Sequence, residues 1–536
     1  MPESSQYTDH GSFKSWIFTA AAFLILLAIV VLGAQRYLEY YLEKQMKEIA
    51  GSRYVLQMDD LHVNLLNRDV TVSGIILRPA SPSDDSAHFA PTRVHAIHLD
   101  NVGLLPYLRN GMFRIEDISI DRPSINLRGR VRRPDSTEKK WLTELSNHRL
   151  PPIQVQHFGI TDASIQLWHP ADSSLEAAVK QLDIQLDQVT LDSATAADPP
   201  FIRYRSLHIR AQQLQSQTPE NFYTFSLDSL FISSSDSSLT MNSLAVTPRY
   251  PRYTFAEHHG FETDRIDLEI SRIDIVKPDL STIFRNKLQA QHVLVNGAKM
   301  EIFHDKRMPF PAKPHRPLPH QALDTLSTGI AIDTVSILDS WITYSEHQPE
   351  ASRAGTITFG DLSASITSLA NQASLRTSRE AIELSAQTSI MDAAPLHLRA
   401  TFPLDQPNRH TLEGTLGKME MDELNPVLEP LAFARITSGR IDSMRFAMEL
   451  APGSATGSVI MAYNGLNIQM LDREDIETGA SNELLSLLAN MLKIKSDNDR
   501  LPLREGTVSF ERDPQKSIFH YWWKSLLSGL RNSIGL

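Results

Sequence analysis

The sequence lacks cysteine, long basic runs and the short motifs that mark most enzymes. Without cysteine, thiol catalysis, disulfide bonds and thiolate metal sites are all excluded. A net charge of −11 with scattered basic residues makes nucleic acid a poor partner. The 19 histidines form no zinc-protease or calcium-loop motif, and the adjacent His258 and His259 would point to opposite faces of a strand. We therefore expect no enzymatic activity, no bound metal and no cofactor.

An uncharged, mostly apolar run spans residues 16–34. It is long enough to cross a bilayer as one helix and longer than the core of a typical signal peptide. Residues 37–50 continue with helical spacing of apolar residues. We predict a transmembrane anchor at 16–36 between a polar tail (1–15) and a juxtamembrane helix, with a removed signal peptide as the alternative. The anchor residues are Trp16, Phe23, Leu24, Leu26, Leu27, Val30 and Val31.

The remainder of the chain is dominated by strict alternation of apolar and polar residues. Residues 266–270 and 273–275 illustrate it, because every second residue is Ile or Leu. Period two places apolar side chains on one face of a strand and polar side chains on the other. This pattern predicts a mainly β fold built on an antiparallel sheet with one hydrated face.

A ten-residue unit recurs four times, at 118–127, 158–167, 293–302 and 335–344. Each copy has two apolar-x-apolar segments joined by a link rich in Asp, Asn, Gly or Pro. The link has the composition of a turn between two short strands. The first two copies start 40 residues apart (118 to 158) and the last two 42 apart (293 to 335). Repetition at this period predicts an array of similar units.

Changes in composition divide the chain further. Residues 51–305 and 321–480 are expected to form two β portions, separated by a Pro-rich loop at 306–320. Residues 481–536 carry helical apolar stripes, including Leu484–Leu492, and are expected to be helical. The last segment either covers a sheet edge that would otherwise aggregate or acts as an amphipathic helix at a membrane surface or in a groove.

Several segments resemble the AsmA-like family of bacterial envelope proteins, relatives of TamB and the bridge-like lipid transfer proteins. The resemblance rests on the membrane anchor, on residues 104–111 (Leu-Leu-Pro-Tyr-Leu-Arg-Asn-Gly) and on the unit at 118–127 that follows them. It extends to the late segments Leu424–Leu428, Ile436–Ile441 and Tyr463–Leu466. It implies an elongated, curled antiparallel sheet, called a repeating β-groove, with an N-terminal transmembrane helix and C-terminal amphipathic helices.

The resemblance also implies a function and a location. It implies an inner-membrane, single-pass protein whose bulk lies in the periplasm, although the flanking basic residues favour the opposite orientation. The implied partners are phospholipids and the inner membrane, with outer-membrane or envelope proteins as further partners. Phospholipid acyl chains would be held or conducted along the groove.

The alternating positions are the candidate groove lining. They are Ile118, Ile120, Ile125, Leu127, Ile160, Ile165, Leu167, Leu268, Ile270, Val293, Val295, Met300, Ile302, Ile337 and Ile342. One alternative is an assembly or scaffold factor for outer-membrane proteins, which would pair client strands at an open sheet edge. Another is an array of β-sandwiches with closed cores and a binding role.

Overall fold

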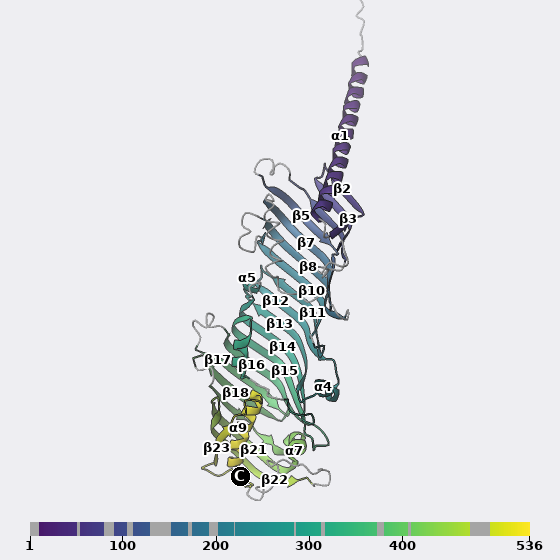
Figure 1. Cartoon of the computed structure of the whole chain (residues 1–536). Coiled ribbons are helices and arrows are strands. Elements are labelled where there is room, and N and C mark those ends of the chain that lie inside the picture. The colour runs from purple at the N-terminus through teal and green to yellow at the C-terminus, as the bar shows by residue number, and fades with distance from the viewer. Residues whose placement is uncertain are drawn as a thin grey trace, which may run out of the picture. The chain divides into compact units, whose positions relative to one another are not determined.

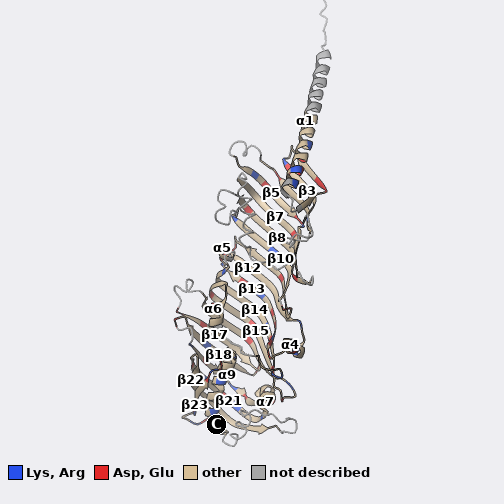
Figure 2. Ribbon diagram, viewed as in Figure 1, with Lys and Arg blue, Asp and Glu red and all other residues tan. Residues whose placement is uncertain are grey.

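The computed structural model describes residues 10–50, 54–79, 91–103, 111–128, 152–169, 174–191, 202–218, 220–283, 286–311, 317–371, 380–405, 409–471 and 494–535. The chain divides into two compact units, Met1–Leu214 and Gln215–Leu536. Each unit is built mainly from β-strands, as the alternation predicts (Figure 1). Charged residues of both signs are scattered over the strands (Figure 2).

The first unit begins with a long helix, α1 (His10–Ala50), followed by a sheet. Among the described residues, no helix is both long and apolar enough to cross a membrane. The side chains of Trp16, Phe23, Leu24 and Leu26 lie outside the described residues. The strands are β1 (Tyr54–Gln57), β2 (Asp60–Asn64), β3 (Asp69–Pro79), β4 (Thr92–Asp100), β5 (Phe113–Asp121), β6 (Ser124–Arg128), β7 (Ile153–Trp168), β8 (Leu175–Leu191), β9 (Ile202–Arg203) and β10 (Ser206–Gln217).

The second unit continues with long strands and short helices. The strands from β11 to β19 pair successively, β19 and β20 both pair with β21, and β22 and β23 follow. The strands are β11 (Tyr223–Ser233), β12 (Ser238–Pro248), β13 (Asp264–Val276), β14 (Lys287–Asp305), β15 (Gly329–His347), β16 (Gly355–Ala370), β17 (Ala381–Ile390), β18 (Ala394–Pro403), β19 (His410–Leu416), β20 (Met419–Glu420), β21 (Ala434–Leu450), β22 (Ser454–Met470) and β23 (Glu505–Glu511). The helices are α4 (Arg252–His259), α5 (Leu280–Ile283), α6 (Pro319–Thr325), η3 (Met421–Leu424), α7 (Asn425–Ala432) and α9 (Ile518–Ser533).

The sheet is mixed, so the expectation of a purely antiparallel sheet is wrong. Strand β7 runs parallel to β5 and β6, and β15 runs parallel to β14. The parallel registers reproduce the sequence periods, because Ile118 lies opposite Phe158 and Val293 lies opposite Val335. Each repeated unit therefore lies beside its neighbouring copy. A parallel pair needs a crossover, and the Pro-rich segment 306–320 forms part of the one from β14 to β15.

The links inside the repeated units are kinks within strands, and the expected turns between short strands are not formed. The units at 158–167, 293–302 and 335–344 each lie within one long strand, β7, β14 or β15. In the first copy, β5 and β6 both run along β7. The backbone instead enters the left-handed region at Asp162, Gly297 and Asp339. Asp and Gly tolerate this conformation, which explains why the links look like turns.

The kinks of neighbouring strands are aligned in the second unit. The ladder skips Ser243 on β12, Ser271 on β13 and Gly297 on β14, so each kink faces the next. The exposed Ser243 and Ser271 are polar, as a residue displaced toward solvent should be. The register is the same on both sides of these positions, so no strand carries an extra residue relative to its neighbour. The kinks therefore form one row across β12–β14.

Two further expectations are revised at the ends of the fold. His258 and His259 lie at the end of helix α4, where they stack on Tyr250 and Phe222, respectively, with ring centroids 3.8 Å apart in both pairs. The segment 481–536, expected to be helical, contains strand β23 as well as α9. The helical stripe Leu484–Leu492 lies outside the described residues, as does most of the unit at 104–111.

Candidate functional site

The second unit carries one continuous apolar face across β11–β15. Cross-strand partners share a face of the sheet, and the aligned kinks keep the apolar residues in phase from strand to strand. We call this surface the second-unit apolar face. Its rows are Ile232, Leu239, Ile275, Val293 and Val335; Leu230, Met241, Ile273, Val295 and Ile337; Leu227, Leu244, Ile270 and Ala298; Phe225, Val246, Leu268, Met300 and Ile342; and Ile266, Ile302 and Tyr344.

The first unit has a comparable surface, the first-unit apolar face, on β4–β8. Its strands also keep their apolar residues in phase across kinks, here at Asp162 of β7. The parallel register of β5 and β6 against β7 sets equivalent positions of the first two repeats side by side. The rows are Leu99, Ile118, Phe158 and Leu186; Ile97, Ile120, Ile160 and Ile184; Ile125, Ile165 and Val179; and Leu127, Leu167 and Ala177.

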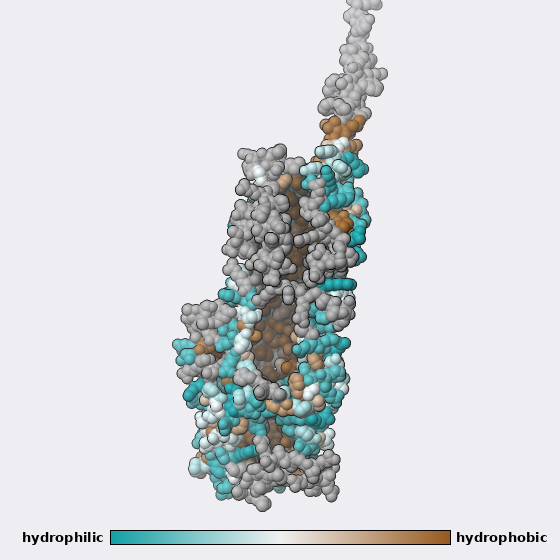
Figure 3. Space-filling model, in the orientation of Figure 1, coloured by the Kyte–Doolittle hydropathy of each residue, from teal (hydrophilic) through white to brown (hydrophobic). Residues whose placement is uncertain are grey.

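All fifteen candidate lining residues fall on these two faces, seven on the first and eight on the second. Each of them is half-buried, neither sealed in a core nor fully exposed. The hydrophobic cluster of the second-unit face is drawn only from residues of β11–β14 among those described. The space-filling view shows hydrophobic surface lining a hollow between hydrophilic borders over these strands (Figure 3). Other residues of the second-unit apolar face, namely Leu227, Leu239, Ile273 and Ile275, are buried, so the face is covered in part and open in part.

The end of the second unit is closed. Strands β17–β23 alternate between fully buried and exposed residues, and their buried side chains form the largest hydrophobic cluster in the described chain. Helix α9 lies against β22 and β23, where it is drawn in yellow in Figure 1. Leu318 beside α6, Met421 of η3 and Tyr521 of α9 complete the cluster. The apolar face thus ends where these helices cover it.

Helix α9 also covers the free edge of the sheet, as one of the two alternatives for this segment predicts. The Ser509 N–H donates to Ser528 Oγ at 3.2 Å, and Asn532 Nδ2 donates to the Thr507 carbonyl at 2.9 Å. These bonds satisfy backbone groups of β23 that have no strand partner among the described residues. An edge occupied in this way is a poor template for another strand.

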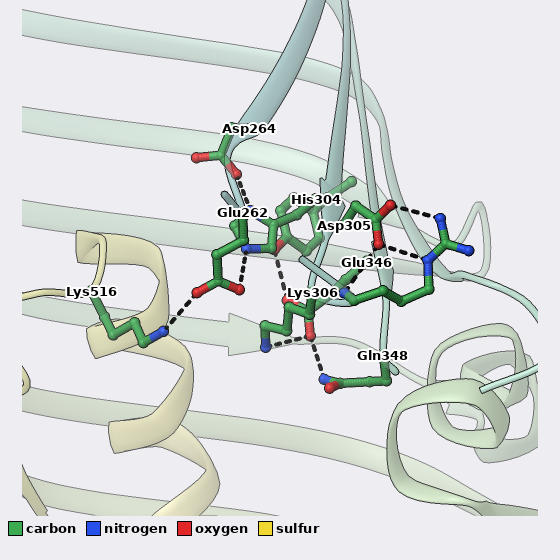
Figure 4. Close-up of polar contacts among 10 residues, drawn as sticks. Glu262, Asp264, His304, Asp305, Lys306, Glu346, Gln348 and Lys516 are labelled. Carbon is green, nitrogen blue, oxygen red and sulfur yellow. Dashed lines mark hydrogen bonds and ion pairs between the residues drawn. The ribbon is translucent and has the colours of Figure 1, made fainter. Parts of the chain in front are cut away.

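A dense network of ionisable groups borders the second-unit apolar face at the ends of β13, β14 and β15; we call it the rim network (Figure 4). His304 lies between two carboxylates, with Nδ1 2.7 Å from Asp264 and Nε2 3.3 Å from Glu262. Lys516, just before α9, lies 3.4 Å from the other oxygen of Glu262. The network therefore ties the start of the C-terminal helix to the border of the open face.

The remaining rim contacts hold the crossover in place. Arg307 binds the buried Asp305 through two hydrogen bonds of 2.9 and 2.7 Å. Lys306 lies 2.7 Å from Glu346. Lys516 Nζ also lies 3.7 Å from the centre of the Phe310 ring. The segment 306–311 is thus fixed between β15 and the residues that precede α9.

The electrostatics of the rim follow from these contacts. Burial by itself lowers the pKa of His304, but the hydrogen bond and charge of Asp264, with Glu346 and Glu262, outweigh it and raise the pKa above its ordinary value. Burial raises the pKa of Asp305, but the hydrogen bonds and charge of Arg307 lower it overall. Because carboxylates contact both ring nitrogens, His304 has no free nitrogen to act as a base.

A cavity of about 960 Å³ lies on the opposite, polar face over β15–β23, away from the apolar rows. Its lining includes Ser365, Ser385 and Ser458, with the Arg399–Glu413 ion pair at 3.5 Å. Short hydroxyl side chains and exposed charges remain well hydrated without a ligand. The apolar faces, and not this cavity, are therefore the candidate functional surfaces.

The described residues hold no group of His, Asp and Glu side chains arranged to bind a metal ion. No known family model matches the chain, and a search of curated proteins found no match either. Sequence reasoning located the apolar faces but missed the rim network. The rim residues are far apart in the sequence, and only the mixed Asp, Glu, His and Lys composition at 262–264, 304–306 and 346 could have drawn attention to them.

Proposed function

We propose that this protein is a membrane-anchored envelope protein that holds or conducts phospholipid acyl chains along its apolar faces, without enzymatic activity. The supporting observation is the half-buried state of all fifteen candidate lining residues, which lie on strands that the described helices contact only weakly. Exposed apolar patches of this extent mark sites for apolar ligands or partners. Each buried methylene group contributes about 0.8 kcal/mol, so one acyl chain can bind with useful affinity.

The dimensions of the second-unit apolar face suit acyl chains. Five strands spaced ~4.8 Å apart give rows of about 20 Å, somewhat more than half of the ~30 Å hydrocarbon core of a bilayer. Each row is bordered by further rows, so more than one chain can lie side by side. Polar headgroups would then lie at the hydrated borders of the sheet.

The proposal includes the remaining elements of the resemblance to AsmA-like proteins. Residues 16–36 would anchor the chain in the inner membrane, with the bulk of the chain in the periplasm. The assembly-factor alternative requires an open edge for client strands. The covered edge of β23 argues against it at that end of the sheet.

Lipid mass spectrometry of the purified full chain provides the test. We expect phospholipid to copurify with the protein and to decrease with Ile270→Asp. Glu269→Lys is the matched control, because Glu269 is the exposed neighbour on the opposite face of β13. A photo-crosslinking residue at position 270 should label lipid in cells, and one at position 269 should not. Equal labelling at both positions, or no lipid with the wild-type chain, would contradict the proposal.

A further inference from the structure

The orientation of α9 is fixed by its buried side. Tyr521 and Ser525 are fully buried, and the Tyr521 hydroxyl donates to the Ala451 carbonyl at 2.9 Å. The next residue, Trp522, also points inward, since its Nε1 donates to His410 Nε2 at 2.9 Å. Gly529 packs so closely that a Cβ there would lie 2.6 Å from a methyl group of Val459. The helix therefore cannot rotate to bury its other side.

The other side of α9 carries large apolar residues in contact with solvent. Phe519 is 70% exposed and Trp523 is 48% exposed. Leu527, half-buried, continues the series with the same spacing of four residues. Residues four apart lie above one another on a helix. This outer stripe of Phe519, Trp523 and Leu527 is thus a second apolar surface, distinct from the one that packs on the sheet.

Basic residues accompany the outer stripe. The chain has a net charge of −11, yet residues 512–536 contain Arg512, Lys516, Lys524 and Arg531 against the single acid Asp513. Burial, with the charges of Lys524, Lys306 and Lys516, lowers the pKa of His520 to about 4. Three lysines thus lie near His520 beside the exposed aromatic residues; Lys516 and Lys306 are paired with Glu262 and Glu346, and Lys524 lies on α9 itself. Local positive charge in an acidic protein favours an anionic partner.

We propose that the outer stripe of α9, with Lys524 beside it, binds the surface of a bilayer that contains anionic phospholipids. An exposed Phe/Trp stripe beside lysines is the pattern of helices that lie in the membrane interface, where aromatic rings enter the headgroup region and cations meet lipid phosphates. The proposal deepens the proposed function, because such binding would bring a lipid surface to the end of the apolar face. It does not itself require lipid transfer.

A fluorescent probe at position 519 tests the proposal directly. The chain has no cysteine, so Phe519→Cys gives a single labelling site for an environment-sensitive dye. The full chain is held in nanodiscs and mixed with vesicles of phosphatidylcholine, with or without phosphatidylglycerol. We expect a blue shift of the emission with phosphatidylglycerol vesicles and a smaller shift at high salt. The matched control is Phe231→Cys, which replaces an exposed aromatic residue of β11 far from α9 in the sequence.

A capture experiment measures the energetic contribution of the stripe. Phe519→Ser combined with Trp523→Ser should lower the capture of phosphatidylglycerol vesicles by about tenfold or more. Phe231→Ser should leave it unchanged. Both positions on α9 are exposed, and circular dichroism checks that the variant keeps the wild-type fold. No blue shift at position 519, or an equal shift at position 231, would overturn the proposal.

The outcomes separate this proposal from the function proposed above. Vesicle binding without copurified lipid would retain the membrane-docking helix and reject the acyl-chain role. Copurified lipid without vesicle binding would retain the acyl-chain role and reject the membrane-docking helix.

Discussion

Two parts of the second unit begin from the same sequence pattern and end in different environments. In β11–β15 most of the alternating apolar residues stay half-buried, although Leu239, Ile273 and Ile275 are buried, whereas in β19 and β21 nearly all of the corresponding residues are buried. The difference lies in which helices pack against the sheet. Helices η3, α7 and α9 follow or interrupt the closed strands and pack on them, but α4 and α5 contact β13 and β14 only weakly. Alternation therefore specifies an apolar face but does not specify whether another segment packs on it.

Placing a charged residue in the closed strands and in the open strands should give the largest difference in the loss of stability. Ile441→Asp on closed β21 should cost more than about 4 kcal/mol of unfolding free energy, because an unpaired carboxylate would be sealed in a core. Ile270→Asp on open β13 should cost roughly 1–2 kcal/mol, because water reaches the new side chain. Urea denaturation of both full-length variants measures the difference. Comparable losses would mean that both faces are closed.

Shortening a buried side chain in the closed strands should also cost more stability than the same change in the open strands, but the difference should be smaller. Leu412→Ala removes a side chain that is 4% exposed in the closed cluster, and we expect a loss of about 2–5 kcal/mol. Leu268→Ala removes the same atoms from the open face and should cost about 1 kcal/mol. The midpoints of urea unfolding measure both losses. Added phospholipid should stabilise the wild-type chain more than Leu268→Ala, and no such difference would argue against ligand contact at this position.

Glycine substitutions test how closely α9 approaches the sheet. A Cβ on Gly506 would collide with the Gly529 carbonyl oxygen, so Gly506→Ala should cost about 1–3 kcal/mol. A Cβ on Gly159 of open β7 would meet nothing within 4 Å beyond its chain neighbours, and Gly159→Ala should raise stability by about 0.5–1 kcal/mol. Thermal unfolding monitored by circular dichroism distinguishes the expected loss of stability from the expected gain. Stabilisation by Gly506→Ala would show that α9 can move away from β23.

The rim network should give the smallest effect, expressed as a pH dependence. The pKa of His304 is raised above 6.5 in the folded chain, so its stabilising charge is fully present below pH 6.5 and is lost as the pH rises through the folded pKa. His304→Gln cannot gain this charge. The stability difference between wild type and variant should therefore be larger at about pH 6 than at about pH 9. A difference that is constant over this range would mean that His304 is neutral in the folded chain.

Much of the fold was predictable because it depends on local pattern. The rows at Leu268, Ile270 and Met300 follow from period two, and the repeats at 118–127 and 158–167 are neighbours in the sheet. The direction of pairing was not predictable, since a strand repeated after 40 residues can return parallel or antiparallel. The links were misread as turns because Asp and Gly serve both in turns and in strand kinks.

The rim network and the role of α9 depend on longer-range contacts. Glu262 and Lys516 are separated by more than 250 residues, and no local signal connects them. Likewise, Trp522 and Trp523 are adjacent in the sequence, yet one contacts His410 and the other is exposed. Amphipathic patterning showed that the segment has apolar residues, but the packing of Gly529 on β22 and β23 selected the buried side.

The sequence alone determined that the chain forms strands with one apolar face, because successive side chains of an extended backbone point in opposite directions. Only the tertiary structure decided which stretches of that face become a sealed interior and which stay partly exposed. Covering a face requires a distant segment to come back and fit against it, and the energy of that fit belongs to pairs of surfaces that no single stretch of sequence contains.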